Sequence, residues 1–130
     1  VDAAVCLIET GDASVAGAAC DFLGDFAFNS DLGGQAVVHA FDRIIHCLAR
    51  IFRPPKCLPL VGSAISLCAN IVATCSSSHA HLIPLVKPVF LKIVVDPQTP
   101  DVILASTILL LANLAMTVKE ELRECCVGEV

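Results

Sequence analysis

The sequence predicts an all-α fold in which one helical unit of about 45 residues recurs along the chain. Three stretches align without gaps, namely residues 15–27, 60–72 and 103–115. In this alignment Asp25, Asn70 and Asn113 coincide, which gives shifts of 45 and 43 residues. Hydrophobic residues make up 56% of the 130 residues and charged residues only 16%. Because so little of the surface is polar, we expect neighbouring units to cover one another.

The first unit contains an amphipathic run and then a long helix. The run covers Asp2–Thr10 and the long helix covers residues 15–27. Gly11-Asp12-Ala13 separates the two. An aspartate before a helix accepts hydrogen bonds from the free N–H groups of the first turn, so we expect Asp12 to cap the long helix.

The second unit has the same order, with a short helix in front. Ser30–Ala40 predicts the short helix, Phe41–Phe52 an amphipathic helix and Leu60–Thr74 the long one. Pro54-Pro55 marks the turn before the long helix, since proline does not continue a preceding helix. Leu60–Thr74 is apolar on nearly all sides, which is typical of a helix that lies between two neighbours.

The third unit is expected to repeat the three-helix pattern. A short, a medium and a long helix are predicted over His79–Val86, Val86–Val95 and Val102–Met116. Thr99 followed by Pro100 predicts a cap and then a proline at the start of the long helix. After a polar break, Val118–Cys126 predicts a separate short helix that begins a further unit.

Charge and motifs exclude several classes of function. The net charge is −5, from 8 Lys and Arg against 13 Asp and Glu, so no basic surface for a nucleic-acid backbone is expected. The sequence holds no phosphate-binding glycine loop and no Gly-x-Ser-x-Gly motif, and we expect no enzyme. Cys75, His79 and His81 are too few ligands for a zinc site. We therefore expect no metal and no cofactor.

The eight cysteines allow two interpretations. Six lie among aliphatic residues, which favours buried free thiols that act as small hydrophobic side chains: Cys6, Cys20, Cys47, Cys57, Cys68 and Cys75. The adjacent pair Cys125-Cys126 is expected to pack against a further unit. Free thiols predict a cytoplasmic or nuclear protein, and the first residues lack the pattern of a signal peptide. A small secreted, disulfide-linked helical protein is the alternative.

Two apolar stretches resemble membrane spans by hydropathy alone. They are Leu58–Cys75 and Val102–Met116, and both are shorter than the ~20 residues that a bilayer crossing needs. Each also carries an amide near its end, at Asn70 and Asn113. We interpret both as repeat helices and expect no membrane attachment, with a membrane-embedded helical hairpin as the alternative.

The long helices share a motif near their ends. It reads Leu67-Cys-Ala-Asn-Ile-Val72 and Leu110-Leu-Ala-Asn-Leu-Ala115, and more loosely Phe22-Leu-Gly-Asp-Phe-Ala27. With three helices to a unit, this pattern resembles the armadillo repeat family. The resemblance implies a right-handed α-solenoid of about three units, at residues 1–28, 29–74 and 75–117, and a partial unit at 118–130. HEAT repeats, which have two helices, are the close structural alternative.

The resemblance also implies a concave groove lined by the long helices. In peptide-binding armadillo proteins a groove asparagine hydrogen-bonds the main chain of an extended ligand, a role that falls here to Asn70 and Asn113. The first unit has Asp25 instead, which accepts but does not donate when ionised. The alternative is that each asparagine satisfies backbone groups nearby.

One helical turn before these residues lie three more candidate contacts: Asp21, Ser66 and Leu109. None of them is the tryptophan found in grooves of the nuclear-import type, so such a receptor is not expected. The acidic pair on the first long helix would attract a basic partner. The expected function is a non-enzymatic scaffold that binds another protein, as an extended peptide or a helix. Self-association through the exposed faces of the terminal units is a further expectation.

Overall fold

The computed structural model describes residues 1–53, 58–75 and 78–128, which contain seven helices and no strand. An all-α fold is therefore confirmed. In chain order the helices are α1 (Asp2–Thr10), α2 (Ala13–Asn29), α3 (Asp31–His39), α4 (Phe41–Ile51), α5 (Leu58–Thr74), α6 (His79–Val95) and α7 (Asp101–Gly128).

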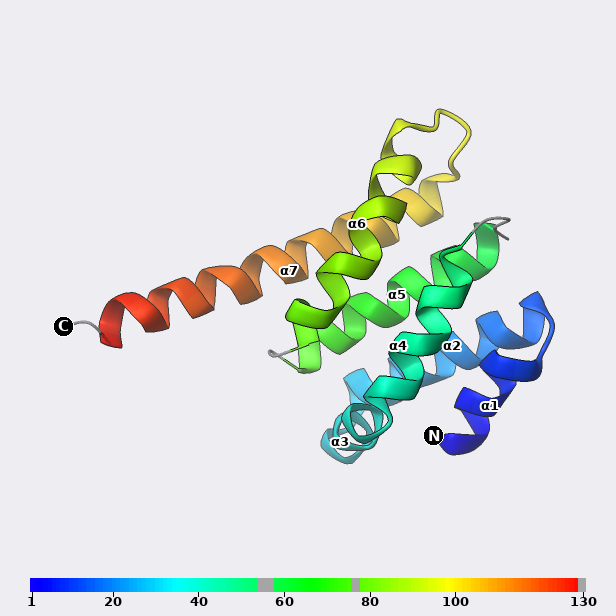
Figure 1. Ribbon diagram of the computed structural model, residues 1–130, viewed down its shortest axis with the longest axis horizontal. Coiled ribbons are helices and arrows are strands. Elements are labelled where there is room, and N and C mark those ends of the chain that lie inside the picture. The colour runs from blue at the N-terminus through cyan, green and yellow to red at the C-terminus, as the bar shows by residue number, and fades with distance from the viewer. Residues whose placement is uncertain (54–57, 76–77, 129–130) are drawn as a thin grey trace.

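The helices form two layers (Figure 1). In one layer the long helices α2, α5 and α7 lie side by side, and α5 packs against both of the others. The other layer contains α1, α4 and α6, which contact α2, α5 and α7 respectively. The short helix α3 contacts α2, α4 and α5. Each long helix thus has a partner in the second layer.

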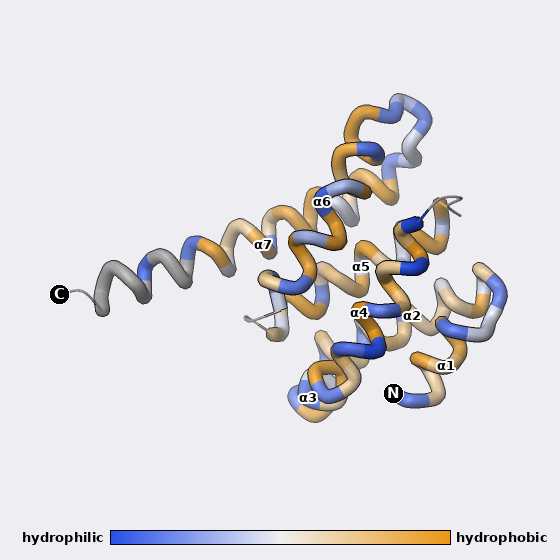
Figure 2. Tube along the Cα trace, viewed as in Figure 1, coloured by the Kyte–Doolittle hydropathy of each residue, from blue (hydrophilic) through white to orange (hydrophobic). Residues whose placement is uncertain are grey.

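The core lies between these two layers. Its members come from every helix of both layers, and the largest fully buried side chains include Leu23, Ile44, Leu48, Leu67 and Leu82. Figure 2 shows apolar residues along α5 and along the first half of α7. As expected, α5 is buried on most of its surface, because α2 and α7 cover opposite sides of it.

The first two units fold as the sequence predicts. The run at Asp2–Thr10 is α1, and the long helices predicted at residues 15–27 and 60–72 lie within α2 and α5. Asp12 caps α2, since its carboxylate accepts from the Val15 N–H at 2.9 Å. The turn predicted at Pro54-Pro55 lies outside the described residues.

The third unit differs from the prediction in its first part. Two helices were expected to meet at Val86, but α6 is one helix that contains both Pro84 and Pro88. The reason is a single buried stripe on α6 at helical spacing: Leu82, Val86, Val89 and Ile93. A break at Val86 would turn half of this stripe away from the core, so burial outweighs the hydrogen bonds that the prolines remove. The unit consequently has two helices, α6 and α7.

The long helix of that unit also differs. The separate short helix predicted at Val118–Cys126 is wrong, because α7 continues through these residues to Gly128. Thr117, which the sequence places at a polar break, is buried and its hydroxyl donates to the Asn113 carbonyl at 3.0 Å. The cap predicted at Thr99 is also wrong: its hydroxyl donates to the Ile93 carbonyl at 2.9 Å, and so ties the end of α6 to the turn before α7.

Cys6, Cys20, Cys47 and Cys68 have free thiols, and the last three are buried. Desolvation by burial raises the pKa of both Cys20 and Cys68 to about 12, and it also raises the pKa of Cys47. Cys6, by contrast, is exposed on α1, and Cys75 is only half-buried, so the expectation of buried thiols is wrong for Cys6 and only partly met at Cys75. Cys57 and the side chains of Cys125 and Cys126 lie outside the described part of the chain.

Candidate partner-binding groove

The three long helices run in the same direction, each shifted by one unit from the last. A Cβ at Gly17 would contact Ser63, and a Cβ at Gly24 would contact Asn70, so early and late positions of α2 meet early and late positions of α5. The Ser66 and Ser106 hydroxyls are 3.0 Å apart between α5 and α7. Later along these two helices, Asn113 Nδ2 donates to the Ala69 carbonyl at 3.0 Å. The parallel arrangement follows from these contacts.

Glycines on these helices allow the close approach. A Cβ at Gly24 would lie 2.7 Å from Asn70 Nδ2, and one at Gly62 would lie 3.1 Å from Ile103 Cγ1. Gly17 and Gly62 occupy the same place in the aligned repeats, 45 residues apart. The shared position of Gly17 and Gly62 in the aligned repeats therefore indicates this close packing, although neither glycine was among the predicted site residues.

A cavity of about 390 Å³ lies across the three long helices. Asp21 of α2 lies on one side of it, Ser66 and Gly62 of α5 lie in the middle, and Ser106 and Val102 of α7 lie on the other side. The remaining lining residues are Leu58, Pro59, Ser63, Pro100 and Ile103. Of the six predicted contact residues, the structure brings Asp21 and Ser66 to this cavity.

The other predicted residues lie along the same layer. Leu109 is exposed on α7 and Asp25 is exposed on α2. Asn70 is half-buried, with its Nδ2 against Gly24. Asn113 is half-buried as well, and it uses one amide N–H to bind α5. An amide has two N–H donors and a carbonyl oxygen with two lone pairs, so this bond uses one of the four hydrogen bonds that the Asn113 side chain can make.

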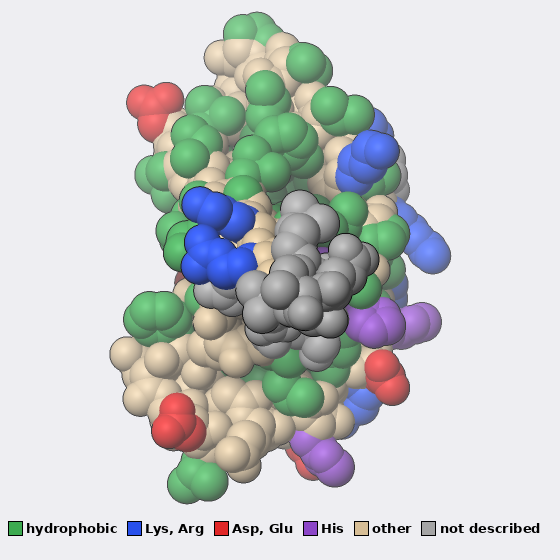
Figure 3. Space-filling model, turned by 90° about the vertical axis from the view of Figure 1, so that its left-hand side faces the viewer, with side chains coloured by type: hydrophobic (Ala, Val, Ile, Leu, Met, Phe, Trp, Pro, Cys, Tyr) green, Lys and Arg blue, Asp and Glu red, His purple; other side chains and the backbone are tan. Residues whose placement is uncertain are grey.

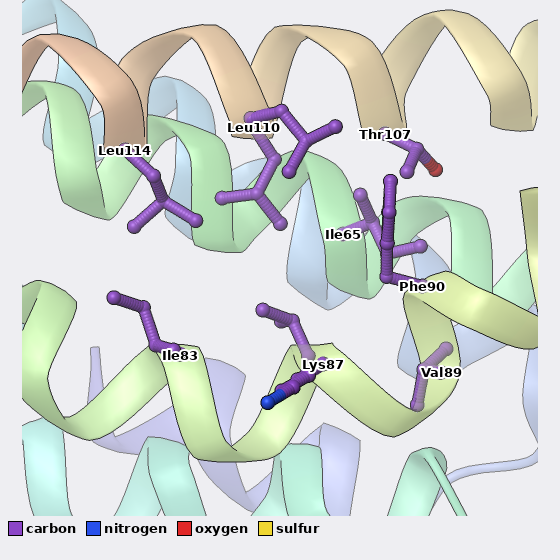
Figure 4. Close-up of a pocket in the computed structure, with 10 residues that line it drawn as sticks. Ile65, Ile83, Lys87, Val89, Phe90, Thr107, Leu110 and Leu114 are labelled. Atoms are coloured by element: carbon purple, nitrogen blue, oxygen red, sulfur yellow. The ribbon is translucent and has the colours of Figure 1, made fainter.

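A second cavity, of about 260 Å³, lies between α6 and α7 (Figure 4). Ile83 of α6 points toward Leu114 of α7, and Phe90 of α6 lies beside Ile65 of α5 and points toward Thr107 of α7. Its lining is entirely apolar, so Lys87 contributes only its aliphatic stem. The cavity shows that α6 and α7 leave apolar surface between them unfilled.

One described helix is long and apolar enough to cross a membrane. It is the Asp101–Lys119 part of α7, with a mean hydropathy of 1.9, of which 28% is buried in the fold. The second apolar stretch of the sequence, in α5, is shorter. A membrane hairpin needs two spans, and residues 1–53, 58–75 and 78–128 provide one of sufficient length.

Within the described residues no three His, Cys, Asp or Glu side chains come together as metal ligands. Comparison of the chain with protein-family models, curated proteins and solved structures gave no significant match. The candidate groove therefore rests on the geometry of this chain.

Proposed function

We propose that this chain is an armadillo-like, right-handed solenoid segment that serves as a non-enzymatic scaffold for protein binding. The ligand is an extended peptide or helix of another protein, held along the layer formed by α2, α5 and α7. The observation that carries the proposal is the cavity that crosses all three long helices, with Asp21 and Ser66 in its wall.

The register of the long helices supports a groove of this kind. Because the helices are parallel and shifted by 40 to 46 residues between contacting positions, equivalent positions repeat in rows across the layer. One row holds Asp21, Ser66 and Leu109. A ligand that crosses the helices would meet one residue of this row at each step, and so would bind without long contacts to any single helix.

The chemistry of the rows indicates what the ligand carries. Asp21 and Asp25 are exposed carboxylates on α2, so a Lys or Arg side chain of the ligand fits this end. Val102 and Leu109, exposed on α7, offer an apolar contact at the other end. Asn70 and the free bonding positions of Asn113 lie between the two ends and would bind the ligand main chain.

A cytoplasmic or nuclear location accords with this function. Three buried thiols with a raised pKa are inert packing groups, and free thiols persist in a reducing compartment. The scaffold needs no metal or cofactor for binding. We propose no partner among nucleic acids, because the chain carries a net charge of −5.

Peptide selection with matched variants tests the groove. A random peptide library displayed on phage is selected against the purified chain, and the affinity of each selected peptide is measured by isothermal titration calorimetry. Val102→Glu places a charge in the cavity wall, where the side chain is 76% exposed. Leu32→Glu makes the same change on α3, at a side chain that is 75% exposed.

The groove predicts that Val102→Glu weakens the selected peptides at least about tenfold, because it buries a charge against them. Leu32→Glu should leave the affinity unchanged. Selected peptides should contain Lys or Arg and lose affinity with Asp21→Asn. Equal affinities for the two glutamate variants would remove the groove assignment.

A further inference from the structure

The last long helix, α7, exposes the positions that its two predecessors bury. In α5 the side chains of Ile65 and Cys68 are 2% and 0% exposed. Their equivalents 43 residues later are Ile108 and Leu111, which are 65% and 40% exposed. In α2 the equivalent positions, 45 residues earlier, are also buried. On α5, Ser66 and Ala69 meet the next long helix, α7. Their equivalents 43 residues later, Leu109 and Ala112, are exposed, so the corresponding face of α7 is uncovered.

We define the free face of α7 as the stripe opposite its buried side. At 100° per residue, eight exposed side chains fall on this stripe: Asp101, Ala105, Ile108, Leu109, Ala112, Ala115, Met116 and Lys119. Those at the two ends are charged and opposite in sign, and no charge lies between them. In Figure 3, which looks at the molecule from the C-terminal end of α7, hydrophobic side chains gather in the upper part of this side.

The charges at the ends indicate what covers the free face. We propose that a second copy of the chain packs against it, with the two α7 helices antiparallel. Asp101 and Lys119 are equally far from Leu110, so an antiparallel pair that crosses there places Asp101 of each copy beside Lys119 of the other. Two symmetric ion pairs then flank a continuous apolar contact, and the small side chains of Ala112 and Ala115 let the helices approach.

A head-to-tail contact with α2 of the second copy is less favourable. Within the chain, Asn113 donates to the Ala69 carbonyl where α7 joins α5. In a head-to-tail contact, Asp25 would take the place of that asparagine and face the carbonyl of Ala112. An ionised carboxylate has no hydrogen to donate, so two acceptors would oppose each other. The symmetric antiparallel contact does not bring these two acceptors together.

The neighbouring helix also exposes apolar side chains. Leu91 and Val94 of α6 are 57% and 52% exposed. Lys87 is also exposed on α6 and is long enough to keep its ammonium in solvent. From Asp101 to Lys119 the free face of α7 is about 27 Å long.

Charge reversal tests the proposal on the whole chain. The molar mass is measured by sedimentation equilibrium over a dilution series, for wild type, Lys119→Asp, Asp101→Lys and the double variant. Lys92→Asp, on α6 outside the free face, is the matched control. Circular dichroism shows whether each variant keeps its helix content. We expect a wild-type dimer whose dissociation constant rises about tenfold in Lys119→Asp, because two pairs become repulsive together.

The double variant decides the orientation. Exchange of the two charges recreates both ion pairs only in the antiparallel dimer, so its dissociation constant should return to within about threefold of wild type. A wild-type chain that is monomeric at every concentration overturns the proposal, as does a double variant no tighter than the single ones. Monomers that all bind phosphatidylcholine vesicles equally would instead identify a lipid surface as the occupant, and would also overturn it.

Discussion

Gly24 is the position where one added methyl group tests the contact between the first two long helices. In Gly24→Ala the new Cβ would lie 2.7 Å from Asn70 Nδ2 and 3.6 Å from Leu67 Cα. Packed atoms do not remain as close as the first of these distances. Either the Asn70 side chain moves out of its place or α2 and α5 separate.

The size of the effect follows from two opposing contributions. Alanine in a helix interior is more favourable than glycine by roughly 0.5–1 kcal/mol, whereas forcing an extra methyl into a packed interface costs roughly 1–3 kcal/mol. We expect Gly24→Ala to lower the free energy of unfolding by about 1 kcal/mol. At Gly17 of the same helix the Cβ would lie 3.5 Å from Ser63 Oγ, an ordinary contact, so Gly17→Ala should raise it by about 0.5–1 kcal/mol.

Urea denaturation followed by circular dichroism measures both variants. The opposite signs at two glycines in one helix are the distinctive result. Adding Asn70→Ala to Gly24→Ala removes the obstructing amide and should recover most of the loss. If both glycine variants stabilise the chain equally, α2 and α5 are not in close contact at Gly24, and the proposed register fails.

Three further predictions concern the core and the thiols. Asn113→Ala removes the hydrogen bond to Ala69 and should lower the free energy of unfolding by about 0.5–1.5 kcal/mol in urea denaturation. Ile44→Ala, at a fully buried side chain, should cost about 2–5 kcal/mol in the same assay. Folding raises the pKa of Cys20 and Cys68 from 9.0 to about 12. The stability that these thiols contribute is therefore complete below pH 9 and is lost as the pH rises toward 12. The urea midpoint should fall between pH 9 and 12, and a constant midpoint over this range would contradict the prediction.

The sequence predicts the helices of the first two units because their signals are local. Asp12 caps α2 with its own side chain, and the apolar pattern of α5 is continuous between its ends. The repeat shift also transfers to the structure, because contacts such as that between Asn113 and Ala69 join residues 44 positions apart. The repeat shift of 43 to 45 residues is thus close to the sequence separation of residues that meet across the long helices.

The third unit was not predictable in the same way. Pro84 and Pro88 are usual signs of a helix end, yet α6 passes through both. What keeps it whole is burial of one side against other helices, and this contribution is tertiary. In α7, the hydroxyls of Thr107 and Thr117 donate to carbonyls four residues earlier, so two polar residues lie inside a helix without exposing a donor.

The candidate groove was likewise predictable only in part. The aligned rows placed Asp21 and Ser66 on neighbouring helices, and both line the cavity. Gly62 and Ser106 also line it, but they were not among the predicted contacts. The hydroxyl of Ser106 meets Ser66 at a shift of 40 residues rather than 43, so alignment of the repeats alone would not pair them.

The central claim is that α2, α5 and α7 follow one another in a single layer, each beside the next. Spin labels introduced by an unnatural amino acid at Asp21, Ser66 and Leu109, two at a time, measure this arrangement by electron paramagnetic resonance and leave the native thiols untouched. Neighbouring helix axes lie about 8–10 Å apart, so the account predicts similar separations for 21–66 and 66–109 and about twice that value for 21–109. A separation between 21 and 109 as short as the other two would mean a closed bundle, and would contradict it.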